Sequence, residues 1–255
     1  MDRLFFLGSG DAFCHDSRAN QAILIERPQD SILLDCGPTT RYRFKQTHKD
    51  LDRVKAILIT HFHGDHLAGV PFCLLYWHYE SRRTQPLHLV GPYGLKKTVE
   101  NLVLGTYSNL LTENRYPIHF HEFPETNQGL LEVEDFTVQG FPMKHVKEST
   151  GLRVRWKNGD IAITGDTAWN KNIPKLSEGT DVLMMECSTY DTIIPEIHLS
   201  YQEIQEHRKE IRTRALILHH MDEEMIQMTM DPEKFSEIAA SDNFSMPIRG
   251  EPQNA

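Results

Sequence analysis

The chain has 255 residues, of which 39% are hydrophobic and 25% charged, and its formal net charge is −9 at pH 7. This composition is typical of a globular domain and excludes intrinsic disorder and fibrous repeats. The acidic balance argues against a general electrostatic attraction to nucleic acid or to acidic lipid. Four widely spaced cysteines indicate neither a disulfide framework nor a cysteine zinc site. We expect no signal peptide and no membrane association, and therefore a cytoplasmic protein.

Short strand-like runs alternate with helix-like segments along the chain, with Gly, Pro and Asp between them. In the first half we expect strands at Arg3–Leu7, Ala22–Glu26, Ser31–Asp35, Val54–Thr60 and Leu87–Val90, and helices at Thr39–His48, Pro71–Arg82 and Gly94–Leu111. In the second half we expect strands at Pro117–Phe123, Leu130–Gln139, Gly151–Trp156, Ile161–Thr164, Val182–Glu186 and Ala215–Leu218, and helices at Trp169–Ser177 and Ser200–Ile211.

Val54–Thr60 is a nearly continuous apolar run, which is typical of a strand that is covered on both faces. Many strands interleaved with helices predict an α/β protein, a layered sandwich with helices packed outside the sheets. No linker or charged run divides the chain, so we expect one domain over residues 1–244. Residues 245–255 have the composition of a frayed C-terminal tail.

The most informative pattern is His-Phe-His-Gly-Asp-His, His61 to His66, which directly follows the Val54–Thr60 strand. Side chains two positions apart in extended backbone share a face, so His61 and His63 can bind one metal ion together. Gly64 permits a sharp turn, after which Asp65 and His66 can point toward a second ion. Imidazole and carboxylate ligands suit zinc, iron or manganese.

Further ligands must come from other parts of the chain, because one loop cannot complete two metal shells. Three candidates follow apolar strands: His145, Asp166 and His220. Layered α/β proteins place their sites where such strands end in loops. His119 and His121 also alternate on a predicted strand, but no Asp-His follows, which favours a solvated strand face; His88 has no partner pattern.

His-x-His-x-Asp-His, a lone His, Gly-Asp-Thr and a final His after a strand together resemble the metallo-β-lactamase superfamily, over about residues 4 to 222. The resemblance implies a four-layer αββα sandwich with two divalent metal ions at one edge, zinc first and manganese or iron as alternatives. It implies His61, His63 and His145 on the first metal, Asp65, His66 and His220 on the second, and Asp166 between them. Asp35 matches the early Asp that braces the metal loop. His219 is the alternative to His220; the superfamily pattern of strand, small residue and His favours His220.

The segments Met-Met-Glu-Cys-Ser-Thr-Tyr-Asp (184–191) and Ile-His-Leu-Ser-Tyr-Gln-Glu (197–203) are similar to those of ribonuclease Z and of the cyclic phosphodiesterases of phosphonate catabolism. That branch places a Glu and a His beside the metals, which by position are Glu186 and His198. Since a divalent cation activates water as hydroxide near neutral pH, the resemblance implies a metal-dependent hydrolase. In such an enzyme His198, oriented by Glu186, protonates the leaving group, and Asp65 belongs to the catalytic set.

The substrate expected from these features is a small phosphodiester or a cyclic phosphate. Ribonuclease Z typically carries a long basic arm that clamps tRNA, whereas here only 21 positions separate His145 from Asp166. Together with the acidic net charge, this disfavours a nucleic acid partner. A ribonuclease Z-type nuclease that processes RNA 3′ ends, and a lactone, thioester or amide hydrolase on the same metals, stay open as alternatives. So do a redox diiron protein and a homodimeric assembly.

Overall fold

In the computed structural model of the chain, which describes residues 1–81, 83–113 and 115–249, two seven-stranded sheets lie face to face. The first sheet has the order β14 (Ser245–Pro247), β1 (Arg3–Gly8), β2 (Ala22–Glu26), β3 (Ser31–Leu34), β4 (Val54–Leu58), β5 (Leu87–Gly91), β6 (Ile118–Glu122). The second has the order β13 (Ile238–Ala239), β12 (Thr213–His219), β11 (Thr180–Glu186), β10 (Gly159–Ile163), β9 (Thr150–Trp156), β8 (Phe136–Pro142), β7 (Gly129–Val133).

Each sheet is half antiparallel and half parallel. Strands β1, β2 and β3 pair antiparallel, and β3 to β6 continue in parallel. Strands β7 to β10 pair antiparallel, and β10 to β13 continue in parallel. The carboxyl ends of neighbouring parallel strands meet at one edge of a sheet, so each sheet offers one edge at which loops can gather side chains.

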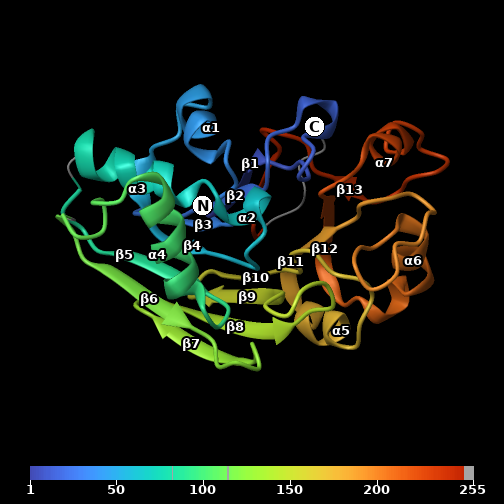
Figure 1. Ribbon diagram of the computed structural model, residues 1–255. Coiled ribbons are helices and arrows are strands. Elements are labelled where there is room, and N and C mark those ends of the chain that lie inside the picture. The colour runs from blue at the N-terminus through green and yellow to red at the C-terminus, as the bar shows by residue number, and fades with distance from the viewer. Residues whose placement is uncertain (82, 114, 250–255) are drawn as a thin grey trace.

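Helices cover the outer faces of both sheets (Figure 1). The first sheet carries α1 (Thr40–Gln46), α3 (Val70–Tyr79) and α4 (Leu95–Thr106), and the short α2 (Gly64–Leu67) precedes α3. The second sheet carries α5 (Asn172–Ser177), α6 (Tyr201–Glu206) and α7 (Glu223–Met228). Three single-turn 3-10 helices, η1 (His15–Ser17), η2 (Leu51–Arg53) and η3 (Arg208–Glu210), lie in connections. The result is the predicted αββα sandwich.

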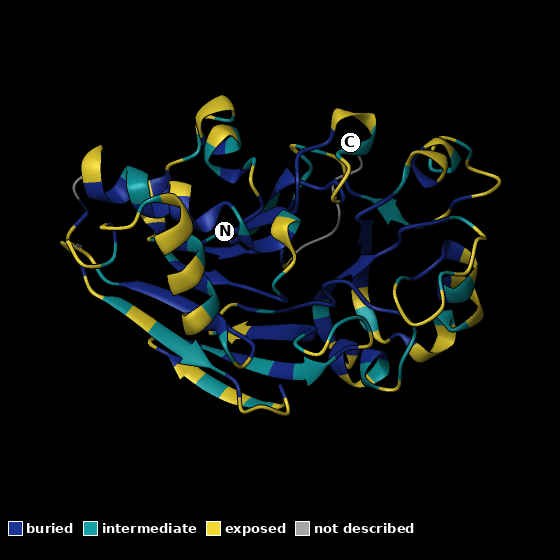
Figure 2. Cartoon of the chain, in the orientation of Figure 1, coloured by how far each residue is buried: buried dark blue, intermediate teal, exposed yellow. Residues whose placement is uncertain are grey.

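Three apolar clusters hold the four layers together, one between the sheets and one under each layer of helices. Strand β4 contributes to two of them: Ala56 and Leu58 pack between the sheets, whereas Val54 and Ile57 pack under the helices. The expectation of a strand covered on both faces is therefore confirmed. Figure 2 shows the same pattern, with buried strands at the centre and exposed residues on the outer turns.

The predicted strand Leu130–Gln139 is wrong, because the structure forms two strands there, β7 and β8, joined at Glu134 and Asp135. Glu134 adopts a left-handed conformation with φ of 51°. Gly or Asn usually supplies this conformation in tight hairpins, and their absence hid the turn. The predicted helix Gly94–Leu111 ends earlier, at Thr106, and Arg82 of the predicted helix Pro71–Arg82 lies outside the described residues.

The C-terminal segment is also more ordered than its composition indicates. Residues 245–247 form β14, which pairs antiparallel with β1 through Leu4 and Met246. Met246 and Ile248 pack into the apolar cluster between the sheets. The expectation of a frayed tail from residue 245 is therefore wrong for this stretch, since burial of two apolar side chains stabilises the added strand. Residues 250–255 lie outside the described part of the chain. None of the described helices is long and apolar enough to cross a membrane.

A close backbone contact holds the His61–His66 loop against the end of β3. The amide of Cys36 donates to the carbonyl of His66 over 2.7 Å, and the amide of Gly69 donates to the carbonyl of Cys36 over 2.8 Å. A Cβ atom on Gly69 would lie 2.1 Å from the carbonyl oxygen of Gly37. The loop can approach this closely only because position 69 has no side chain.

We expect Gly69→Ala to lower the free energy of unfolding by about 1–3 kcal/mol, because the added methyl group forces α3 away from residues 36 and 37. Gly105→Ala is the matched control, since a Cβ atom at this position in α4 meets nothing within 4 Å. It should raise stability by about 0.5–1 kcal/mol, because Ala is the better helix former. Urea unfolding followed by circular dichroism measures both; equal effects would contradict the close contact.

Candidate metal centre

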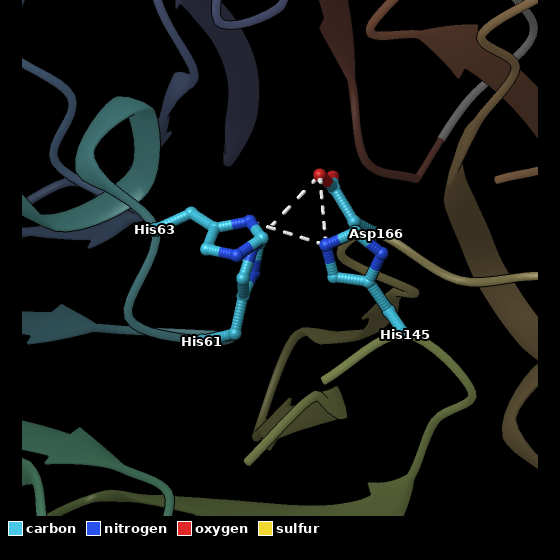
Figure 3. Close-up of side chains that lie close together, drawn as sticks. All are labelled: His61, His63, His145 and Asp166. Carbon is cyan, nitrogen blue, oxygen red and sulfur yellow. Dashed lines mark hydrogen bonds and ion pairs between the residues drawn. The ribbon is translucent and has the colours of Figure 1, made fainter. Parts of the chain in front are cut away.

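Most of the predicted ligands lie on loops that leave both sheets at the same edge of the sandwich, and Asp65 and His66 lie in the short helix α2. His61 and His63 follow β4 in the first sheet, while His145, Asp166 and His220 follow β8, β10 and β12 in the second. In Figure 3 the side chains of His61 and His63 point across a narrow gap toward those of His145 and Asp166. The structure thus brings together residues that are up to 159 positions apart in the sequence.

The first ligand group consists of His61, His63, His145 and Asp166, whose donor atoms all lie within 4.8 Å of one another. Nε2 of His145 is 3.1 Å from Nδ1 of His63. Nε2 of His61 is 3.7 Å, and Nε2 of His145 is 3.9 Å, from Oδ2 of Asp166. Imidazole and carboxylate donors at this spacing can share one cation, as in a four-coordinate zinc site.

The second ligand group consists of Asp65, His66, Asp166 and His220. Nε2 of His66 lies 3.2 Å from Oδ2 of Asp65 and 3.3 Å from Oδ1 of Asp166. Nε2 of His220 lies 3.3 Å and 3.5 Å from the same two oxygens. Asp166 therefore belongs to both groups, with Oδ2 facing the first and Oδ1 facing the second.

The donor atoms in this centre fit two divalent cations. Nε2 of His61, Nε2 of His66 and Oδ1 of Asp166 are buried and have no hydrogen-bond partner among the described residues. A buried polar atom without a partner costs free energy, and a cation bound between these atoms would remove that cost. Imidazole and carboxylate donors are the set that zinc, iron and manganese accept.

A buried carboxylate, Asp35, orients the ligands from behind. Its Oδ2 accepts from Nδ1 of His66 over 2.8 Å and from the hydroxyl of Thr60, whereas its Oδ1 accepts from the amide of Thr60. Because the Thr60 hydroxyl donates to Asp35, it accepts from Nδ1 of His61, 3.1 Å away. Both imidazoles thus carry their proton on Nδ1 and direct the lone pair of Nε2 into the centre. The role predicted for Asp35 agrees with this geometry.

Sequence reasoning missed Thr60, which links Asp35 to His61. Only its place directly before His61 could have indicated it, because one hydroxyl residue at the end of a strand has no distinctive pattern. The carbonyl of Ile197 was equally hidden: it accepts from Nδ1 of His145 over 2.8 Å and orients that ring in the same way.

Two residues of the centre have strained backbone. Asp35 and His220 both adopt left-handed conformations, with φ of 55° and 61°. Such conformations cost about 1–3 kcal/mol in residues other than Gly and persist where surrounding contacts hold them. Here the amide of Asp35 donates to the carbonyl of Leu58, and the amide of His220 donates to the carbonyl of Ser9.

His219 and His220 have different surroundings, and this difference decides which of the two can serve as the last ligand of the second group. The His219 ring lies 6.0 Å from that of Phe6, and its two nitrogens have no hydrogen-bond partner among the described residues. Burial lowers the pKa of His219 to about 3, which keeps the ring neutral. Only His220 joins the second ligand group.

The Glu186–His198 pair lies next to the second ligand group. Glu186 is the last residue of β11 and is fully buried, and its carboxylate accepts from Nδ1 of His198 over 3.0 Å. The same carboxylate accepts from the amide of Thr167 and, over 2.8 Å, from the hydroxyl of Ser188. The rings of His198 and His220 are stacked with centroids 5.8 Å apart.

Opposing effects set the protonation of these groups. Burial would lower the pKa of His198, but the hydrogen bond and the charge of Glu186 outweigh it and raise that pKa. Burial would raise the pKa of Asp65, but the neighbouring imidazoles of His220 and His66 hold it far below its usual range. The site therefore combines a carboxylate whose pKa is lowered, Asp65, with an imidazole whose pKa is raised, His198.

We expect Asp35→Asn to weaken divalent metal binding about 10–100-fold, the usual cost of removing an outer hydrogen-bond partner of a ligand. The substituted amide places a donor where Nδ1–H of His66 needs an acceptor, so the imidazole loses its orientation. Competition against a chromophoric chelator measures the affinity. Asp52→Asn, an exposed change in η2, is the control and should bind metal like the wild type. Equal affinity in the two variants would contradict the orienting role.

Comparisons with known proteins agree with this geometry. Ribonuclease Z from Oceanobacillus iheyensis is 32% identical over 158 residues, which are 61% of this chain and 50% of that protein. The chain therefore spans about half the length of the curated relatives that it matches.

Two solved structures share the fold. The metallo-β-lactamase fold protein YhfI from Bacillus subtilis superposes with a TM-score of 0.77 at 17% identity, over 97% of this chain and 100% of that one. A diphosphatase of the PhnP family superposes with a TM-score of 0.74 at 14% identity, over 99% of each chain. The resemblance to the metallo-β-lactamase superfamily, in its ribonuclease Z-like branch, is confirmed. The family model described as Anti-Pycsar protein Apyc1 matches residues 2–241, and the chain belongs to that family.

Proposed function

We propose that the protein is a dinuclear metal-dependent phosphodiesterase that hydrolyses a small phosphodiester or a cyclic phosphate. The observation that carries the proposal is the position of Asp166 between two ligand groups, with the Glu186–His198 pair beside the second. Two cations a few ångströms apart, flanked by a proton donor, suit in-line displacement at phosphorus.

In this proposal His61, His63 and His145 would hold the first cation, Asp65, His66 and His220 would hold the second, and Asp166 would contribute to both sites. We propose zinc for both sites, with manganese and iron as alternatives, because the donor set accepts all three. When bound, the two ions supply a Lewis acid for a phosphate oxygen and lower the pKa of water.

The protein's own groups then have separate tasks. Asp65, ionised and 9% exposed, would accept a hydrogen bond from the attacking water. Glu186 fixes the ring of His198 through Nδ1 and favours its protonated form. Nε2 of His198 is thereby available to protonate the departing alkoxide, as a general acid does. Thr167 and Ser188 hold the Glu186 carboxylate in place.

A small substrate is supported by the chain between His145 and Asp166. Strands β9 and β10 form a plain antiparallel hairpin there, so this stretch has no room for an inserted basic arm. The net charge of −9 would also repel a polyanion, even after two divalent ions reduce it. A cytoplasmic location and a soluble small-molecule substrate are part of the same proposal.

One alternative has specific support: cleavage of RNA 3′ ends, because ribonuclease Z from Oceanobacillus iheyensis is 32% identical to the chain over 158 residues. A substrate panel separates the two. We expect the zinc- or manganese-loaded protein to hydrolyse bis(p-nitrophenyl) phosphate and cyclic nucleotides, and to leave a precursor tRNA intact. Cleavage of the tRNA alone would favour the nuclease, and turnover of lactones or thioesters alone would contradict phosphodiester chemistry.

The role of His198 predicts a dependence on the leaving group. His198→Gln should lower kcat by about 10²–10⁴-fold for a substrate with an alkoxide leaving group, which needs a proton. The loss should be much smaller for bis(p-nitrophenyl) phosphate, because p-nitrophenolate leaves without protonation.

Glu186→Gln should show the same selectivity with a smaller loss, since it acts only through His198. His207→Gln is the matched control: this histidine pairs with Glu210 in η3 and should leave both substrates unaffected. Equal losses for the two leaving groups in His198→Gln would indicate a role in binding rather than in protonation.

A further inference from the structure

Three histidines outside the metal centre meet where β5 and β6 of the first sheet face the β7–β8 hairpin of the second, at the lower left of Figure 1. His88 on β5 is in register with His119 on β6, and His121 follows two positions later on the same face. Glu134, in the hairpin turn, approaches His88 from the second sheet. The expectation that His119 and His121 only form a solvated strand face missed His88, which is buried beside them.

The spacing of these rings matches that of the ligands in the metal centre. The ring centroid of His88 lies 5.3 Å from that of His119 and 5.2 Å from that of His121. In the metal centre the corresponding separations are 4.7 Å for His61 and His63 and 5.4 Å for His66 and His220. Nδ1 of His88 and Nε2 of His121 are only 3.0 Å apart, close to the spacing of two nitrogens bound to one zinc ion.

The carboxylate of Glu134 fixes the tautomer of His88. Nε2 of His88 donates to Oε1 of Glu134 over 3.1 Å, so the lone pair of this imidazole is on Nδ1, where it accepts from Nε2 of His121 until a cation replaces that proton. The arrangement matches that of His66, whose outer nitrogen donates to Asp35 while the other faces the centre. Carboxylates in this position are typical partners of histidines that bind metals.

We propose that His88, His119 and His121 form a second, separate site for a divalent cation that prefers imidazole, such as Zn²⁺, Ni²⁺ or Cu²⁺. His88 and His121 supply two donors that are already converged, and Glu134 orients His88. The exposed ring of His119 supplies the third donor by rotating about its side-chain bonds. The site does not depend on the proposed hydrolysis.

The surrounding charges are compatible with a cation. Burial together with the neighbouring His88 and His119 lowers the pKa of His121, which favours the neutral ring that a metal needs. Lys55 is the nearby positive charge, and its ammonium is already paired with Glu134, Asp135 and Asp30. Because Glu134 belongs to the second sheet, a cation on His88 would strengthen the link between the two sheets at this edge.

The test is a zinc count on the full-length protein. After equilibrium dialysis against Zn²⁺, wild type should contain one equivalent more than His121→Gln or His119→Gln, or should bind that equivalent at least tenfold more tightly. His207→Gln, outside both clusters, should keep the wild-type count. Hydrolytic activity should stay unchanged in all three variants, which separates this site from the metal centre.

A second measurement covers the buried His88, since His88→Gln can fail to fold. Long-range ¹H–¹⁵N spectra of the imidazoles in wild type should show Nδ1 of His88 and Nε2 of His121 shifting as the additional Zn²⁺ binds. An identical zinc count in wild type and in the His119→Gln and His121→Gln variants, or imidazole signals that do not respond to zinc, would overturn the proposal.

Discussion

The carboxylate of Asp166 is the contact on which the rest of the metal centre depends. Its two oxygens face different groups of imidazoles, Oδ2 toward His61 and His145 and Oδ1 toward His66 and His220. Asp166 follows β10 of the second sheet, whereas His61 and His66 lie in the loop and the short helix α2 that follow β4 of the first. One buried anion therefore links both sheets, and its charge offsets the cost of crowding five imidazoles into a small volume.

Hydrogen bonds on the far side of the rings fix the orientation of the ligand imidazoles. Asp35 accepts from His66 and Thr60, Thr60 accepts from His61, and the carbonyl of Ile197 accepts from His145. Each acceptor behind a ring holds the proton on Nδ1, so that Nε2 presents its lone pair to the centre. This preorganisation matters for a metal site, because a ligand that must reorient on binding loses affinity.

A similar arrangement of a carboxylate behind an imidazole occurs a second time on β5 and β6 of the first sheet. There Glu134 takes the place of Asp35, and His88 takes the place of His66. The two places differ in burial: His66 is fully buried, whereas His119 and His121 reach the surface. A weaker and more exchangeable cation site follows from that exposure, since water competes for the donors and His119 must become ordered.

The amino-acid sequence by itself determined the features that are local. The apolar run before His61, the two-residue spacing of His61 and His63, and the order of His145, Asp166 and His220 indicated the ligand candidates, and the family resemblance that these motifs carry implied the four-layer fold. These signals are readable because strand periodicity and loop motifs depend on neighbours along the chain. Only the tertiary structure decided that β14 adds to β1, that Glu134 turns the chain without glycine, and that Thr60 joins Asp35 to His61. It alone brought His88 together with His121 and Glu134, because contacts between distant segments depend on how strands are ordered and aligned in the sheets, which no local pattern specifies.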